Sequence, residues 1–423
     1  MTSGKQKYFN NLAKEIFKFY IEHRAECQRE YSMAEDTSFR HFYETIEDEN
    51  KINQLFATVS TAVLTANKYE KNILHAHWCQ SHKAKIQRIP IKLFPQREFS
   101  QETYAYFFKW HGYCILHIEA QATGSYTVGG IADIIRYIGD NPYLYPTTII
   151  SLGICFGIDE NRQVLGDTYI SNKIYPYFMG AKWDEKGYFV SDNHMFRLNS
   201  NLYGRIKSEI LDTNVLKTLD FNTDFGNYIT GEAVISNKDV RDIFVGITTQ
   251  DVSAGDMESY GLFKECCGRN VIIPCLTVKS ICDWGVLKNF LKLEIIQELA
   301  KTEIGISQAE LKKVKDSLQA FASFHAYSVL DLLLKNHVFS HSIQEGLSDV
   351  IQHICEHERV IYFLSIQKYV KEVGQKLLGT FEPLHGFLEA ITKNLGEEGI
   401  LYPCVQKSDF ADQVWKIKCH DNK

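Results

Sequence analysis

Residues 254–285, AGDMESYGLFKECCGRNVIIPCLTVKSICDWG, hold two acidic side chains in settings typical of a doubly wound α/β domain. Glu258 follows Met257 and opens a stretch with helical character, whereas Asp283 ends an apolar run typical of a buried strand. In doubly wound α/β domains, the starts of helices and the carboxyl ends of strands gather at the ligand-binding edge of the sheet. We therefore expect Glu258 and Asp283 to lie in one site.

Strand-like and helix-like segments alternate on both sides of this stretch, from about residue 57 to 300. Residues 57–67 and 147–159 are β-branched and apolar, as buried strands are, and residues 68–78 have helical character. His111 and Gly112 mark a turn between two further strands. The alternation predicts an α/β fold in three layers, with a mixed, largely parallel sheet between helices.

Helical periodicity replaces this alternation at both ends of the chain. The first 56 residues predict two helices, the second from about Phe39 to Phe56. Beyond residue 300 the pattern predicts an all-α region, in which Ser307 and Glu310 form a helix-capping box. The predicted domains are a helical segment at 1–56, a catalytic domain at 57–300 and a helical regulatory or assembly domain at 301–423.

The composition is that of a soluble globular protein. Of 423 residues, 45% are hydrophobic and 23% are charged, and the net charge of -6 favours neither nucleic acid nor an anionic membrane as a partner. The 11 cysteines form no CxxC pair, and the first residues contain no apolar signal core, so we expect reduced thiols in a cytoplasmic protein. No apolar run is long enough to cross a bilayer.

A possible metal motif lies in the C-terminal region. His353 and His357 fit the pattern H-x-x-E-H, which places two histidines on one face of a helix. No third ligand is identifiable, so we interpret the pair as a solvated or core-edge face. We expect neither a metal nor another cofactor.

Five segments, taken in order, resemble the purine nucleoside phosphorylase and uridine phosphorylase superfamily. The pattern is most like 5′-methylthioadenosine/S-adenosylhomocysteine nucleosidase, and DMES followed by SICD is its most specific part. The resemblance covers a little over half of the chain. The matching segments are VLTANKYE (63–70), ATGSYTVGGIADII (122–135), SLGICFG with LGDTYIS (151–157 and 165–171), ITGEAVIS (229–236), and DMES with VKSICD (256–259 and 278–283).

The resemblance implies roles for four side chains in cleaving an N-glycosidic bond. Such cleavage passes through an oxocarbenium-like ribose and is easier when the leaving purine is protonated. Glu70 would activate the attacking water, and Asp283, in a setting that favours a raised pKa, would assist the purine at N7. Glu258 would hold the ribose hydroxyls, with Met257 packed on the sugar. Read without the resemblance, Asp283 and Glu258 are also suited to helix starts.

Further substrate-binding positions follow from the same match. Cys282 stands where the family usually has serine, and Val234 stands where it tends to have an aromatic residue that stacks on the base. The remaining implied contacts are the backbone of Ile235, the glycine-rich positions Gly124 and Gly153, and the hydroxyl of Ser125.

The resemblance leaves the acceptor open between water and phosphate. Phosphorylases bind phosphate through arginine and serine groups. Here Ile154 replaces the hydroxyl and no arginine precedes it, which favours water. A phosphorylase and a non-catalytic nucleoside-binding or assembly module remain the alternatives.

The expected substrate is a purine nucleoside or nucleotide with adenine as the base. The family's ribose pocket is often completed by a neighbouring subunit, which implies a homo-oligomer. Nucleosidase-like domains fused to helical regions resemble nucleotide-depleting effectors of bacterial antiviral defence. That resemblance adds AMP and ATP as candidate substrates, with Arg162, Lys173 or Arg197 as sources of positive charge, and a protein partner for the C-terminal helices.

Overall fold

The computed structural model describes the chain in ten stretches. They are 3–93, 103–177, 182–183, 189–190, 195–232, 235, 237–248, 251–267, 273–285 and 294–341. Val234 and the histidine pair at 353 and 357 lie outside these stretches. No helix among the described residues has the length and apolar character needed to cross a membrane.

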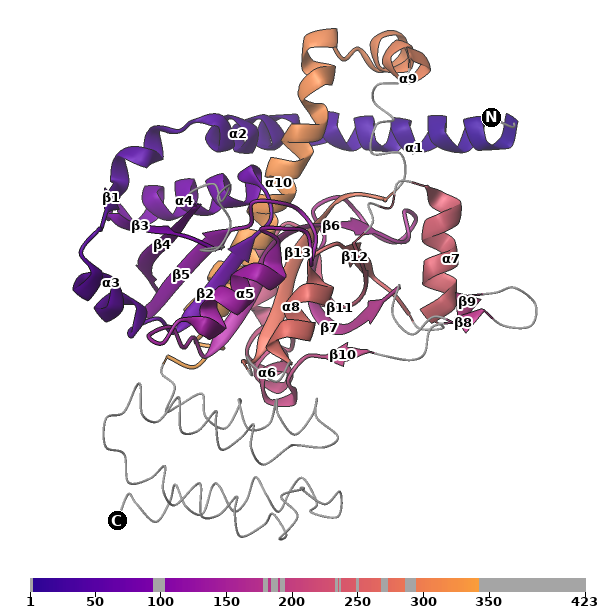
Figure 1. Ribbon diagram of the computed structural model, residues 1–423. Helices are drawn as coiled ribbons and strands as arrows, with labels where there is room; N and C mark the ends of the chain where they lie inside the picture. Colours follow the sequence, from indigo (N-terminus) through magenta and orange to yellow (C-terminus); the bar gives the residue numbers. More distant parts are fainter. Residues whose placement is uncertain are drawn as a thin grey trace.

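A large mixed sheet forms the centre of the molecule (Figure 1). Its strands are β1 (Tyr43–Thr45), β2 (Thr61–Thr65), β3 (Ile86–Ile91), β4 (Thr103–Trp110), β5 (Tyr113–Glu119), β6 (Thr148–Gly157), β7 (Thr168–Pro176), β10 (Phe196–Arg197), β11 (Thr223–Thr230), β12 (Ala254–Asp256) and β13 (Cys275–Asp283). They follow the order β1-β3-β4-β5-β2-β6-β12-β11-β7-β10, and β13 pairs with both β6 and β7. The short strands β8 (Lys182–Trp183) and β9 (Phe189–Val190) pair separately.

The parallel part of the sheet brings three strand ends together. Strand β6 runs parallel to β2 on one side and to β13 on the other. Every residue of β2 is buried, as is β13 up to its last residue, because helices cover both faces of this part of the sheet. The carboxyl ends of β2, β6 and β13 therefore meet at one edge.

The hairpin between β4 and β5 follows from its two turn residues. His111 and Gly112 both have positive φ, 47° and 87°, which suits a two-residue turn that matches the twist of antiparallel strands. The predicted turn at this position is confirmed.

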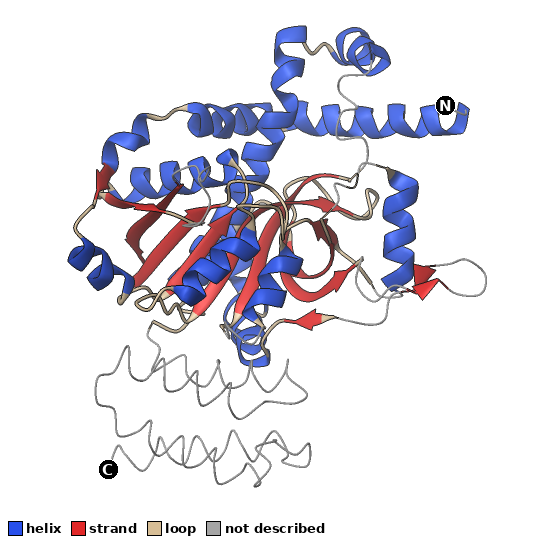
Figure 2. Ribbon diagram, in the orientation of Figure 1, coloured by secondary structure: helices blue, strands red, loops and turns tan. Residues whose placement is uncertain are grey.

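Helices cover both faces of the sheet (Figure 2). On one face α5 packs against α8, and on the other α4, α10 and α2 pack against one another. The α-helices are α1 (Ser3–Glu22), α2 (Arg24–Glu35), α3 (Glu49–Phe56), α4 (Lys68–His82), α5 (Ile131–Asp140), α6 (Ser200–Ile206), α7 (Lys238–Thr248), α8 (Ser259–Cys266), α9 (Glu294–Leu299) and α10 (Gln308–Lys335). Shorter helical turns are η1 (Ser38–Phe42), η2 (Lys207–Leu211), η3 (Asn214–Thr218) and η5 (Ala300–Ile304).

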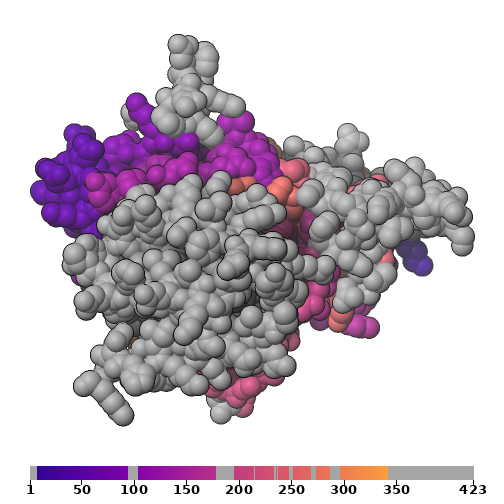
Figure 3. Space-filling model, turned by 60° about the horizontal axis from the view of Figure 1, so that its bottom comes forward, coloured from indigo at the N-terminus to yellow at the C-terminus, as the bar shows by residue number. Residues whose placement is uncertain are grey.

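The predicted second helix, from about Phe39 to Phe56, is wrong in its first half. That stretch forms η1, the edge strand β1 and then α3, which begins only after Asp48. The side chain of Asp48 accepts a hydrogen bond from the backbone N–H of Lys51 and so caps the start of α3. Figure 3 shows the indigo residues of this part of the chain at the outer edge of the molecule.

The prediction of a mixed α/β sheet with flanking helices is confirmed. Helix α10 begins where the capping pattern placed it, since the hydroxyl of Ser307 accepts from the backbone N–H of Glu310. This helix belongs to the predicted C-terminal domain, yet it packs against β6, β13 and α4. The division into three domains stays a prediction, and α10 is part of the packing around the sheet.

Candidate active site

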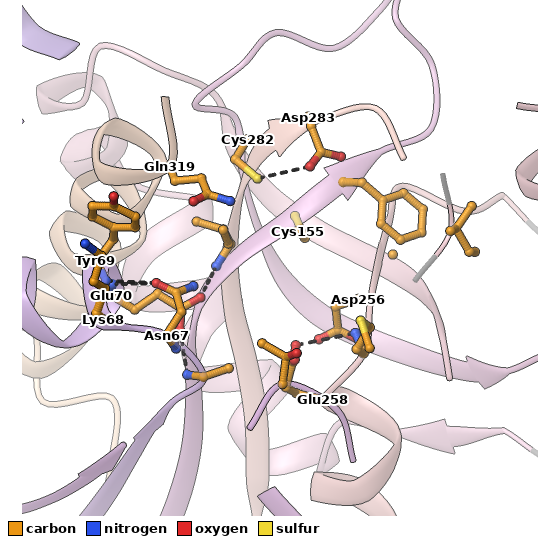
Figure 4. Close-up of a pocket in the computed structure, with 17 residues that line it drawn as sticks. Asn67, Lys68, Tyr69, Glu70, Cys155, Asp256, Glu258, Cys282, Asp283 and Gln319 are labelled. Carbon is orange, nitrogen blue, oxygen red and sulfur yellow. Dashed lines mark hydrogen bonds between the residues drawn. The ribbon is translucent and has the colours of Figure 1, made fainter. Parts of the chain in front are cut away.

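A cavity of about 230 Å³ opens at the edge where β2, β6 and β13 end (Figure 4). Helix α4 begins on one side of it and α8 on another. Six of the predicted site residues line it: Glu70, Ile235, Met257, Glu258, Cys282 and Asp283. Segments far apart in the sequence therefore meet in one place, as the ordered motifs led us to expect.

Glu70 is held in the first turn of α4 by hydrogen bonds to the backbone. The side chain of Asn67 caps the helix by accepting from the N–H of Glu70, and the Glu70 carboxylate closes the capping box. That carboxylate accepts from the backbone N–H groups of Ala66 (2.6 Å), Asn67 (3.1 Å) and Ile154 (3.0 Å). Glu70 therefore both caps the start of α4 and lines the cavity.

Burial changes the acidity of Glu70. Its side chain is only 3% exposed, and this desolvation raises its pKa to about 7. The positive charge of Lys279 acts in the opposite direction, while the negative charge of Glu258 adds to the rise. A carboxyl group with a pKa near neutrality can exchange a proton at physiological pH, as a general base must.

Gly153 allows β6 to pass close to this carboxylate. A Cβ atom added at Gly153 would lie 2.0 Å from Oε1 of Glu70, well inside van der Waals contact. Gly153 is absent from the lining of the cavity. Its role in the geometry is to make room for Glu70.

Lys279 is a buried cation beside the cavity that the sequence reasoning missed. Its ammonium group lies 2.6 Å from Oε2 of Glu258 and 3.0 Å from Oδ2 of Asp256. Desolvation lowers the pKa of Lys279, but the surrounding carboxylates of Asp256, Glu258 and Glu70 outweigh it and raise that pKa overall. A lysine in the middle of the apolar strand LTVKSICD was the signal that could have identified it.

Gly124 and Ser125 lie behind the cavity rather than on its surface. The backbone N–H of Gly124 donates to Oε1 of Glu258 at 3.2 Å. The hydroxyl of Ser125 donates to the carbonyl of Met257 at 2.7 Å and accepts from the N–H of Gly261 at 2.8 Å. Both residues therefore hold the Met257–Glu258 segment in place.

A local irregularity in β13 turns two adjacent side chains toward the cavity. The register between β13 and β6 shifts between Ile281 and Asp283. In a regular strand neighbouring side chains point to opposite faces, but here Cys282 and Asp283 both line the cavity. Oδ1 of Asp283 accepts from the N–H of Gly285 at 2.7 Å, and Oδ2 lies 3.6 Å from the thiol of Cys282.

The wall next to Asp283 is apolar. Cys155, Phe156 and Ile235 line this part of the cavity. The ring of Phe156 is enclosed by backbone, since a Cβ added at Gly255 would lie 2.1 Å from it. A flat apolar ring next to a carboxyl group suits a planar heterocycle.

Comparisons with known proteins identify structural neighbours. The 5′-methylthioadenosine/S-adenosylhomocysteine nucleosidase from S. pneumoniae is 15% identical with a TM-score of 0.44, over 66% of this chain and 99% of that chain. The corresponding enzyme from Neisseria meningitidis is 12% identical with a TM-score of 0.46, over 65% and 98%. Futalosine hydrolase of Helicobacter pylori gives 12% and 0.46, over 65% and 97%.

No protein-family model matches the chain, and no curated protein matches it in sequence. The roles below rest on the geometry of the site.

Proposed function

We propose that this protein hydrolyses the N-glycosidic bond of an adenine nucleoside. The observation that carries the proposal is the buried carboxyl group of Glu70, with a pKa of about 7, in the same cavity as Glu258 and Asp283. Two carboxyl groups in different surroundings are the usual means of dividing base and acid roles in glycoside cleavage.

Glu70 is the general base in this mechanism. Its ionised carboxylate accepts a proton from a water molecule as the oxygen attacks the anomeric carbon of the ribose. The backbone donors of Ala66, Asn67 and Ile154 fix the direction of the carboxylate. Positioning of this kind lowers the entropic part of the barrier.

Glu258 and Asp283 act on the two halves of the substrate. The carboxylate of Glu258 accepts from the ribose hydroxyls, and its paired cation Lys279 balances its charge. Asp283 passes a proton from solvent to N7 of the purine as the bond to the ribose breaks, so that the base leaves as neutral adenine, while Phe156 and Ile235 contact its faces. The bond between ribose and base breaks, water supplies the new hydroxyl, and the products are free adenine and ribose or its 5′-derivative.

The hydrogen bond that the backbone N–H of Ile154 donates to Glu70 favours water over phosphate as the acceptor. That N–H group, in the glycine-rich segment where phosphorylases bind phosphate, is already engaged. Incubation with adenosine, with and without inorganic phosphate, separates the two reactions. We expect equal adenine release and free ribose in both; phosphate-dependent release with ribose 1-phosphate would establish the phosphorylase. Binding of adenosine without any release would establish the non-catalytic module.

The charges around the cavity bear on which group the substrate carries at its 5′ position. Arg162, Lys173 and Arg197 do not line the cavity, and Lys68, which does, pairs with Glu35 at 2.8 Å, so we place adenosine and methylthioadenosine before AMP and ATP. We also propose that the protein is a nucleotide-depleting effector in antiviral defence, that it forms a homo-oligomer and that its C-terminal helices bind a protein partner. Preferential release of adenine from ATP or AMP would support the effector role.

A further inference from the structure

Gln319 brings helix α10 into the candidate active site. Helix α10 packs along β6 and β13, and Gln319 lines the cavity together with Glu70, Cys282 and Asp283. Figure 4 shows its carboxamide pointing toward Cys282, on the opposite side of the cavity from Glu258. The side chain therefore lies on the side of the base rather than on the side of the ribose.

Gln319 stands among packed residues of α10. Leu318, Ala320 and Phe321, its neighbours along the chain, are buried. Gln319 itself is half-buried and lines the cavity. A carboxamide that a bound ligand separates from water costs free energy unless it finds a hydrogen-bond partner. The cavity is the place from which such a partner can come.

The wall that carries Gln319 is fixed against α4. Asp316 lies one turn earlier on the same face of α10. Asp316 acts on Tyr69 of α4. Burial of the Tyr69 hydroxyl and, next, the negative charge of Asp316 raise the pKa of Tyr69 to about 12. Tyr69 also lines the cavity, next to Glu70. The hydroxyl of Ser323 donates to the carbonyl of Gln319 at 2.8 Å. Gln319 is thus presented from a fixed helix beside the first turn of α4.

We propose that Gln319 is a base-specificity residue whose carboxamide binds adenine through its amino group and an adjacent ring nitrogen. A carboxamide offers one acceptor and two donor hydrogens, which match the N6 donor and the N1 acceptor of adenine. Unsubstituted purine has no amino group at position 6 and satisfies only the hydrogen bond at N1. The inference rests on the proposed function, and it assigns part of the base selectivity to a helix outside the predicted catalytic domain.

Base selectivity in a Gln319→Met variant tests this inference. The change keeps the length and helix propensity of the side chain but removes its donors and acceptor. We expect kcat/KM for adenosine to fall on the order of ten- to a hundredfold, mainly through KM, with a smaller fall for purine riboside, which lacks the 6-amino group. Gln308→Met, at the exposed start of the same helix, should leave both values unchanged. An unchanged ratio of adenosine to purine riboside in Gln319→Met would overturn the inference.

Direct binding of the free bases separates this inference from the proposed function. By calorimetry, the wild-type protein should bind adenine more tightly than unsubstituted purine, and Gln319→Met should lose that preference. This result would support the inference even if no nucleoside were cleaved, whereas equal binding of both bases by the wild type would contradict it. If Gln319→Met melts at a lower temperature, Gln319→Leu removes the same donors and acceptor with a shorter side chain and should lose the same preference.

Discussion

The two sides of the cavity place their carboxyl groups in opposite surroundings. Glu70 is buried and accepts three backbone hydrogen bonds. Asp283 is half-buried, and one of its oxygens accepts from the N–H of Gly285 while the other lies near the thiol of Cys282. The difference shows how one fold can give two carboxyl groups separate tasks. The buried side of the cavity holds Glu70 with a pKa near neutrality, and the more exposed side presents Asp283 to the substrate.

Removing the charge of Glu70 should have the largest effect on the rate of adenine release. Glu70→Gln keeps the size of the side chain but cannot accept a proton from water, so we expect the rate of adenine release to fall about 10²- to 10⁴-fold. Adenine binding, measured by calorimetry, should change little. Glu30→Gln is a matched control, because Glu30 is also buried in a helix but pairs with His77 away from the cavity. A Glu70→Gln variant with the wild-type rate would remove Glu70 from the mechanism.

Substitution of Asp283, on the more exposed side of the cavity, should change the rate in a different way. Asp283→Asn retains a hydrogen-bonding group but not a carboxyl group, and we expect kcat to fall about 10²-fold. Since Glu70 is untouched, the pH dependence that its titration imposes should persist. Rate measurements between pH 5 and 9 on wild type and Asp283→Asn compare the two. Loss of the pH dependence in Asp283→Asn would mean that Asp283, not Glu70, is the titrating group.

Lys279 links the ribose wall to Glu70, and its removal should affect both. Lys279→Met leaves the buried carboxylates of Asp256 and Glu258 without their cation, which costs about 3–5 kcal/mol of unfolding free energy. Because Lys279 lowers the pKa of Glu70, its loss should also raise that pKa. Urea denaturation measures the first effect and a pH–rate profile the second. An unshifted profile in a folded Lys279→Met variant would show that Lys279 does not act on Glu70.

The close contact between Gly153 and Glu70 predicts that a side chain at position 153 lowers the stability of the protein. Gly153→Ala places a methyl group 2.0 Å from Oε1 of Glu70, so backbone or carboxylate must move. We expect a cost of about 1–3 kcal/mol from overpacking and a lower rate. At Gly204, in α6, an added Cβ meets nothing within 4 Å, so Gly204→Ala should be neutral or slightly stabilising. Equal melting temperatures for the two variants would contradict the close packing at Gly153.

Much of the site could be predicted from the sequence because its motifs are local. The segments that contain Glu70, Glu258 and Asp283 each combine a buried strand or helix start with an acidic side chain, and such patterns depend on neighbouring residues alone. Their common location follows from parallel strands, whose carboxyl ends meet at one edge.

The contributions that the sequence did not predict depend on long-range packing. Gln319 reaches the cavity only because α10 packs behind β6 and β13, and nothing in the periodicity of α10 indicates that neighbour. Lys279 was missed because its three acidic partners come from two other segments of the chain. The strand β1 replaced the first half of a predicted helix because its pairing with β3, far along the sequence, outweighed local propensity.

The raised pKa of Glu70 also predicts how the free energy of unfolding changes with pH. Its pKa in the folded protein, about 7, lies above the ordinary value of 4.5, so the folded state holds this proton more tightly than the unfolded chain. The contribution of Glu70 to stability is therefore most favourable below pH 4.5 and declines as the pH rises toward 7. Glu70→Gln should lack this decline, as determined by urea denaturation at several pH values.

The most direct test of the account is the pH profile of kcat/KM for adenosine in the wild type and in Glu70→Gln. We predict that the wild-type value rises with pH through about 7, as Glu70 loses its proton, and then levels off. The variant should be slow and should lack this rise. A wild-type profile that is flat between pH 5 and 9, or a variant that keeps the rise, would contradict the assignment of Glu70 as the base that activates water.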